Sequence, residues 1–252
     1  MKNRLPSSSK KCSGFSLVEL LVVVAIIVIL LALLIPNAAR VKDRAAIIKC
    51  ATNLEQLGTG VRLWSTDNGG RYPSKWWGTM YAWYGTSGKR GGAYKSKGAK
   101  SRPLNRYLGG PYNDETTDIP TAKCPKDKQT WIHATQTHYE HFGSSYGSNS
   151  KLPASYDYDQ TYPRGLIKED GSHEGRQFSS IKNAGNFVMM TEEGPFMAVW
   201  WSRSLWDARD SEKVFWHDPW RWNAVFADGH VSYITVRNEE WRGYDYSFDY
   251  RF

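Results

Sequence analysis

The chain has 252 residues, of which 40% are hydrophobic and 23% charged, and its formal net charge is +8. This composition excludes an intrinsically disordered chain and a membrane protein with many spans, and the length allows one or two domains. The three cysteines, Cys12, Cys50 and Cys124, lack C-x-x-C spacing, which excludes a zinc finger or a Cys₄ cluster.

A basic leader followed by a long apolar run opens the chain. Residues 1–14 hold four lysines or arginines and no acid, and residues 15–35 carry a single charge, Glu19. As a helix, the run would be about 30 Å long, enough to cross a bilayer core. The alternatives are a buried globular helix and a cleavable signal peptide, but the run is apolar on every side and longer than a signal-peptide core. A retained single membrane span is therefore favoured.

Glu19 is the most informative residue of this span. A carboxylate inside hydrocarbon costs roughly 2–3 kcal/mol or more, so it usually has a partner and a role. The alternative is that Glu19 lies near the end of the span and reaches headgroup water.

The sequence Gly14-Phe15-Ser16-Leu17-Val18-Glu19 lies between the basic leader and the aliphatic run. It resembles the prepilin signal of type IV pilins and type II secretion pseudopilins. The resemblance implies cleavage between Gly14 and Phe15 by prepilin peptidase, followed by N-methylation of Phe15. It also implies that Glu19 pairs with the Phe15 amine of a neighbouring subunit during assembly. Pro36 matches the helix-kinking proline of the family, and a proline inside a helix removes a backbone hydrogen bond.

Charge counting leaves the orientation of the span open. The leader and residues 37–50 each contain four lysines or arginines, so the positive-inside rule is tied. Only the resemblance implies a single-pass protein of the bacterial inner membrane, with a cytoplasmic leader and a periplasmic or extracellular head that can be part of a surface filament.

Beyond the span, the sequence predicts that the helix continues in amphipathic form. Apolar residues recur at spacings of three and four as far as about residue 66 (Val41, Ala45, Ile47, Ile48, Ala51, Leu54, Leu57 and Val61). Asp67-Asn68-Gly69-Gly70 is a strong helix stop. The predicted segments are a cleaved leader (1–14), a transmembrane assembly helix (15–36), an amphipathic half (37–70) and a β-rich head (71–252).

The head is predicted to be a small antiparallel sheet. Two β-rich runs flank Asp228-Gly229, which predicts a hairpin with a type I′ turn, and a further strand is expected over residues 186–191. The expected fold class is α+β and pilin-like: a long N-terminal helix, transmembrane and then amphipathic, packed on this sheet.

The head also resembles a bacterial paralogue group of pilin-like proteins with a C-terminal His-x(9-10)-Asp-Gly motif. The matching residues are His217, Asp228 and Gly229, together with Lys123-Cys124-Pro125 and residues 145–149. Ten residues separate His217 from Asp228 here, whereas the group usually has nine.

Three clusters have the composition of metal sites: His217 with Asp218, Asp228 and His230; His133 with His138, Glu140 and His141; and Asp207 with Asp210 and Glu212. Turn chemistry is favoured for the first cluster and a solvated loop for the second. The third is a weak calcium candidate. We therefore expect no bound metal and no cofactor, with calcium as the alternative.

Residues 75–112 form an aromatic and basic insertion. Within it, residues 89–106 contain seven lysines or arginines and no acid. Basic residues between aromatics can bind single-stranded nucleic acid or sugar rings, but a charge run is usually a solvated face.

Two of the cysteines are candidates for a disulfide. Cys12 would leave with the leader, which leaves Cys50 and Cys124 in an oxidising compartment if the head lies outside the cytoplasm. A bond between them would tie the helix to the head, although spacing alone does not establish contact.

The favoured function is that of a structural subunit without enzymatic activity. Its implied partners are copies of itself or other pilins, prepilin peptidase, the membrane, and the inner-membrane machinery of a type IV pilus or type II secretion system. The alternative is a membrane-anchored extracytoplasmic binding module for polysaccharide or nucleic acid. An anchored hydrolase is disfavoured, because Glu192 and Glu193 on one strand would point in opposite directions.

Overall fold

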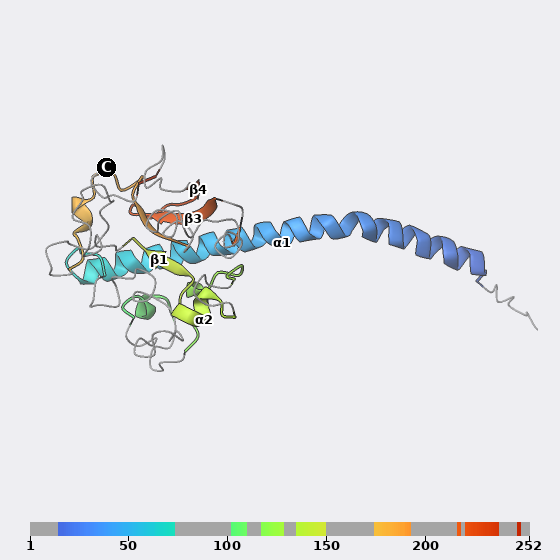
Figure 1. Ribbon diagram of the computed structural model, residues 1–252, viewed down its shortest axis with the longest axis horizontal. Helices are drawn as coiled ribbons and strands as arrows, with labels where there is room; N and C mark the ends of the chain where they lie inside the picture. The colour runs from blue at the N-terminus through green and yellow to red at the C-terminus, as the bar shows by residue number, and fades with distance from the viewer. Residues whose placement is uncertain are drawn as a thin grey trace, which may run out of the picture. The chain divides into compact units, whose positions relative to one another are not determined.

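The computed structural model describes residues 15–73, 102–109, 117–128, 135–149, 174–192, 216–217, 220–236 and 246–247 (Figure 1). By its internal contacts the chain divides into two units, Met1–Arg44 and Ala45–Phe252. Helix α1 (Leu17–Asp67) begins in the first unit and ends in the second.

The first unit contains the apolar part of α1. Its large aliphatic side chains are exposed along the whole run, from Leu17 at 80% to Ile35 at 67%. Among the described residues, α1 is the one helix long and apolar enough to cross a membrane. Pro36 lies inside α1, and the side-chain amide of Asn37 donates to the Leu33 carbonyl at 3.2 Å, near the position where the proline lacks an N–H.

In the second unit, α1 buries one stripe against the head. Cys50, Leu54, Leu57 and Val61 are completely buried, and they follow the helical spacing of three and four. The predicted stripe was too wide, because Val41 and Ile48 are 66% and 65% exposed. Ile48 precedes Cys50 by two residues and therefore lies about 200° away around the helix axis.

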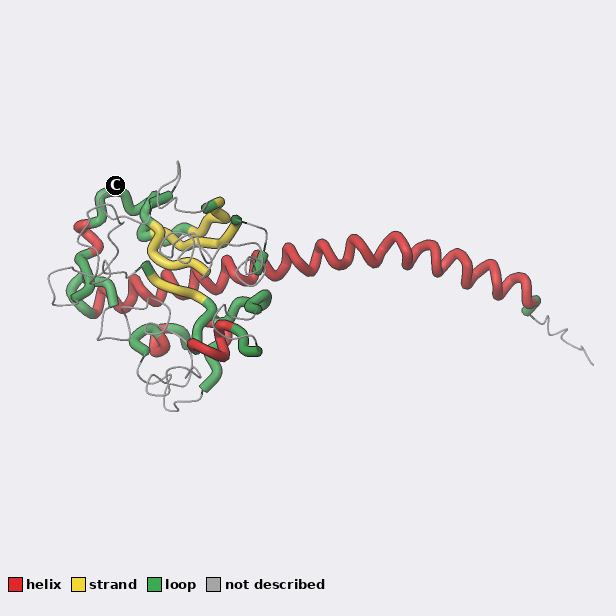
Figure 2. Tube along the Cα trace, in the orientation of Figure 1, coloured by secondary structure: helices red, strands yellow, loops and turns green. Residues whose placement is uncertain are grey.

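The head is built on a four-stranded antiparallel sheet in the order β1-β2-β3-β4 (Figure 2). The strands are β1 (Tyr146–Ser148), β2 (Val188–Glu192), β3 (Arg221–Phe226) and β4 (Val231–Thr235). The short helical elements are α2 (His138–Phe142), η2 (Asn105–Tyr107), η3 (Pro120–Ala122) and η4 (Phe178–Ser180). This arrangement of one long helix and an antiparallel sheet confirms the predicted α+β class.

The hairpin at Asp228-Gly229 is present, but its turn is not type I′. That turn needs a positive φ at both central residues, and among the described residues Gly229 (φ 97°) has one while Asp228 does not. The Gly229 amide donates to the Phe226 carbonyl at 2.9 Å, which is the pattern of a three-residue loop closed by a left-handed glycine. A side chain at position 229 would also overlap the guanidinium of Arg62, whose Nη1 donates to the Asp228 carbonyl at 2.6 Å.

The main core lies between α1 and the sheet. Leu54, Leu57 and Val61 pack there with Met189 of β2 and Val225 of β3. Gly58 permits this close approach, because a Cβ at that position would lie 2.7 Å from Val225 Cγ2. The core holds β2, which is buried along its whole length, beside the helix, and that placement creates the cluster described below.

Candidate functional site

The start of α1 is closed by a capping box. Ser16 precedes the first helical residue, and its Oγ accepts from the Glu19 amide at 3.2 Å. In return, Glu19 Oε2 accepts from the Ser16 amide at 2.8 Å. This reciprocal pair satisfies two backbone donors that a helix N-terminus would otherwise leave unpaired. Glu19 therefore has a local structural role in the isolated chain, in addition to any role between subunits.

The sequence contained the signal for this cap. Ser-x-x-Glu before an apolar run is the capping-box pattern, and residues 16–19 fit it. Sequence analysis treated Glu19 as a lone charge and missed its local partner. Phe15, the predicted new N-terminus, is 73% exposed, while Gly14 and the rest of the leader lie outside the described residues.

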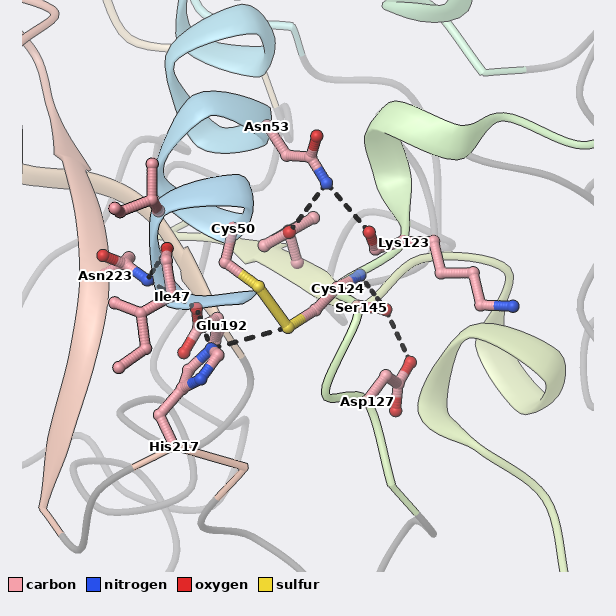
Figure 3. The surroundings of a disulfide bond; sticks show 12 residues. Ile47, Cys50, Asn53, Lys123, Cys124, Asp127, Ser145, Glu192, His217 and Asn223 are labelled. Carbon is pink, nitrogen blue, oxygen red and sulfur yellow. Dashed lines mark hydrogen bonds and ion pairs between the residues drawn. A yellow bond between two sulfur atoms is a disulfide. The ribbon is translucent and has the colours of Figure 1, made fainter. Parts of the chain in front are cut away.

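A second group of polar side chains is buried inside the head (Figure 3). Cys50 comes from α1, Cys124 from the segment after η3, Glu192 from the end of β2, and His217 from the segment before β3. One sulfur, nitrogen or carboxylate oxygen of each residue lies within 4.8 Å of those of the other three. The fold thus brings together four metal-ligating side chains that are far apart in sequence.

Cys50 and Cys124 form a disulfide in this structure, with their Cα atoms 5.3 Å apart. The bond ties α1 to a segment separated from it by 74 residues in sequence. Hydrogen bonds hold the segment around Cys124: the Cys124 amide donates to Ser145 Oγ at 3.0 Å, and Asn53 Nδ2 donates to the Lys123 carbonyl at 2.8 Å.

A histidine and a carboxylate lie against the disulfide (Figure 3). His217 Nε2 is 3.1 Å from Glu192 Oε1 and 3.5 Å from Cys124 Sγ. Both the histidine and the glutamate side chain are fully buried. Asn223 Nδ2 donates to Glu192 Oε1 at 3.1 Å and to the Ile47 carbonyl at 3.2 Å, which fixes that oxygen beside the helix.

Two atoms of this cluster are left without a hydrogen bond. Within the described part of the chain, Glu192 Oε2 and His217 Nδ1 are buried and have no hydrogen-bond partner. A buried polar atom without a partner costs about 1–3 kcal/mol, and more when it is charged. Such atoms are uncommon in folded proteins and call for an explanation.

The predicted residues of the C-terminal motif do not form one site. His217 contacts Glu192 and Cys124, whereas Asp228 Oδ1 accepts from the His230 amide at 3.0 Å and lies 2.7 Å from His230 Nδ1. Partial burial raises the pKa of Asp228, but the hydrogen bonds that its carboxylate accepts from His230 outweigh it and lower the pKa overall. Asp228 and His230 thus stabilise the hairpin turn, and Asp218 lies outside the described residues.

The second predicted cluster belongs to a short helix. Glu140 completes a capping box with Thr137 at the start of α2, and His138 Nδ1 is 2.7 Å from the Ser144 carbonyl oxygen. His141 Nδ1 lies 3.1 Å from Gln136 Oε1. His133, Glu193, the calcium candidates Asp207, Asp210 and Glu212, and most of the 75–112 insertion lie outside the described residues.

The pairing of Glu192 with His217 could not be read from the sequence. The two residues are 25 positions apart, and neither lies at a recognisable ligand spacing from a cysteine. The sequence places Glu192 beside Glu193 on one strand, and the C-terminal motif groups His217 with Asp228. Neither pattern indicates the contact between Glu192 and His217.

Comparison with known proteins bears on the N-terminal segment alone. The family model described as "Prokaryotic N-terminal methylation motif" matches residues 9–35. No curated protein and no solved structure matches the chain. The matched residues include Gly14 and Phe15 together with the first part of α1. The chain therefore carries the N-terminal signal of a type IV pilin-like precursor, which indicates a structural subunit rather than an enzyme.

Proposed function

We propose that the protein is a pilin-like subunit that is cleaved after Gly14, methylated on Phe15 and assembled through its N-terminal helix. The filament would be a type IV pilus or a type II secretion pseudopilus. Before assembly, the subunit would span the bacterial inner membrane once, with the leader in the cytoplasm and the head outside. Its partners would be prepilin peptidase, the assembly machinery, and copies of itself or of other pilins.

The observation that carries this proposal is the exposed apolar stretch of α1 directly behind a methylation signal. Its side chains from Leu17 to Ile35 have no protein cover within the described residues. Burying apolar area is worth about 25 cal/mol per Å², so a helix of this kind needs lipid, or the same helix of other subunits, around it. In a pilin-like protein, lipid surrounds this helix before assembly, and the helices of other subunits surround it afterwards.

Glu19 has two candidate roles in this cycle. Its carboxylate caps the helix through Ser16, and the family resemblance adds a pairing with the Phe15 amine of the next subunit. A carboxylate can accept several hydrogen bonds, so the two roles are compatible in one subunit. Capping needs an acceptor oxygen, whereas pairing in a low-dielectric environment needs the negative charge.

Two substitutions at position 19 separate these roles. Glu19→Gln retains an acceptor for the Ser16 amide but removes the charge, and Glu19→Ala removes both. We expect both variants to insert into the membrane and both to be lost from sheared filaments. Ser16→Ala, which weakens the cap and keeps the charge, should still assemble. Filament entry of Glu19→Gln at the wild-type level would contradict the pairing role.

The processing step is tested by mass spectrometry of the N-terminus after detergent extraction. A chain that begins with N-methylated Phe15 is expected. An intact Met1, or a start near Ala39, would overturn the proposal.

The second candidate function is a membrane-anchored extracytoplasmic module that binds polysaccharide or nucleic acid. It is supported by the composition of residues 75–112, most of which lie outside the described residues. A processed protein that never enters filaments would favour this candidate, and salt-sensitive retention on DNA would identify its ligand as nucleic acid.

A further inference from the structure

We propose that Cys50, Cys124, His217 and Glu192 form a tetrahedral zinc site when the two cysteines are present as thiols. The head would then exist in two cross-linked forms, one closed by a disulfide and one closed by zinc. This inference concerns the interior of the head, and it does not depend on how the N-terminal helix assembles.

The spacing of the ligand atoms fits a single tetrahedral ion. Zinc–sulfur and zinc–nitrogen bonds of about 2.3 and 2.05 Å at a tetrahedral angle place the two atoms about 3.6 Å apart. His217 Nε2 and Cys124 Sγ are separated by 3.5 Å. The corresponding nitrogen–oxygen separation is about 3.4 Å, and His217 Nε2 lies 3.1 Å from Glu192 Oε1. The histidine is thus already at a ligand distance from both neighbours.

The donor set selects zinc. Two thiolates and an imidazole are soft or borderline ligands, whereas calcium and magnesium prefer six or more oxygens. Two thiolates and one carboxylate carry three negative charges, which a divalent cation reduces to one. Because all four side chains are buried, the site would be closed to further ligands, as structural zinc sites are.

The hydrogen bonds around the cluster provide independent support. Glu192 Oε1 is already held by Asn223, which is the type of outer contact that orients a metal-bound carboxylate. Glu192 Oε2 is buried without a hydrogen bond among the described residues. A cation beside this carboxylate would compensate the oxygen that the disulfide form leaves unpaired.

The conversion between the two forms is a two-electron exchange. A dithiol reductant gives two electrons and two protons to the Cys50–Cys124 bond and becomes a disulfide itself. Each protein sulfur leaves as a thiol, and zinc binding then displaces one proton from each thiol. Oxidation by a disulfide reverses the exchange and releases the ion.

Zinc binding is tested on the full-length chain, purified in detergent without a histidine tag. The protein is reduced with dithiothreitol, desalted without oxygen, incubated with zinc chloride, desalted again and assayed for metal. We expect one zinc per reduced chain and none per oxidised chain. Cobalt(II) should give the visible absorption of a tetrahedral thiolate site.

Two ligand variants and one matched control identify the site. His217→Ala and Glu192→Gln should each lower zinc affinity at least tenfold. His230→Ala removes an exposed histidine from the turn between β3 and β4 and should bind zinc like the wild type. Less than one zinc per five reduced wild-type chains, or equal loss in the His230 variant, would overturn the proposal.

Thiol protection keeps the test independent of whether the variants fold. In the reduced wild type, zinc should slow alkylation of Cys50 and Cys124 at least tenfold, as measured by peptide mass spectrometry. Cys12, if the leader is retained, should react at the same rate with and without zinc. Unchanged alkylation of Cys50 and Cys124 would refute the site.

Discussion

The carboxylate of Asp127 lies beside the N-terminus of α2, where it accepts hydrogen bonds from three groups. The amides of His138 and Tyr139 donate at 2.8 and 2.7 Å, and Ser145 Oγ also binds it. Burial raises the pKa of this carboxyl to about 6, although the charge of His138 and these hydrogen bonds oppose the rise. The carboxyl therefore holds its proton more tightly in the folded head than in the unfolded chain.

This raised pKa predicts a pH dependence of stability. Below the unfolded pKa of 3.8 both states hold the proton, and between 3.8 and about 6 only the folded state does. Stability from this group is thus complete below pH 3.8 and declines as the pH rises to about 6, by about 3 kcal/mol. Urea unfolding of the wild type and of Asp127→Asn at pH 4, 5, 6 and 7 measures the difference. An identical pH profile in the variant would contradict this assignment.

Gly58 lies on the buried face of α1, where the helix approaches β3. Alanine has the higher helix propensity, by about 1 kcal/mol. Gly58→Ala should nevertheless destabilise the head by roughly 1–2 kcal/mol, because its methyl group would lie 2.7 Å from Val225 Cγ2. Thr59→Ala is the matched control, since Thr59 is exposed on the same turn. Unfolding followed by the fluorescence of the buried Trp216 and Trp222 provides the measurement.

A Gly58→Ala variant as stable as the control would show that β3 can move away from the helix. The requirement for glycine at position 58 could not be predicted from the sequence of the helix, where a glycine indicates only a lower helix propensity. Helix propensity and the spacing of apolar residues can be read from the sequence of the helix itself. The need for glycine at position 58 arises from the contact with β3, which is formed by residues much later in the chain.

The local elements were predictable, because the signals for them lie within short stretches of the sequence. The ends of α1 follow from an apolar run and from Asp67-Asn68-Gly69-Gly70, and the β3–β4 hairpin follows from two β-rich runs around Asp228-Gly229. The turn type was wrong because it depends on the backbone angle of Asp228, which Arg62 and His230 help to fix. The predicted burial of Ile48 was wrong, because the spacing of apolar residues does not show which face of the helix the sheet covers.

Within the head, the Cys50–Cys124 bond closes a long loop, because 74 positions of sequence separate the two cysteines. A separation of 74 residues gives a loop-closure contribution of about 4 kcal/mol in the chain-entropy treatment. We therefore expect the double variant Cys50→Ser/Cys124→Ser to lose about 2–5 kcal/mol of stability in metal-free, non-reducing buffer.

Cys12→Ser is the control for that loss, because Cys12 lies in the predicted leader. It should leave the urea midpoint unchanged. A double variant with the wild-type midpoint would mean that the noncovalent contacts of α1, namely its core packing and the hydrogen bonds of Asn53 and Asn223, hold it to the head without the disulfide.

The contact between Arg62 and the β3–β4 loop imposes unequal constraints on the two positions. Gly229 is required by its positive φ, whereas the guanidinium beside it is the end of a flexible side chain that can move aside. Shortening Arg62 would free the space but would leave the backbone angle unchanged. During sequence divergence, position 62 can therefore drift while glycine is retained at 229, and a compensating change at 62 cannot release the glycine.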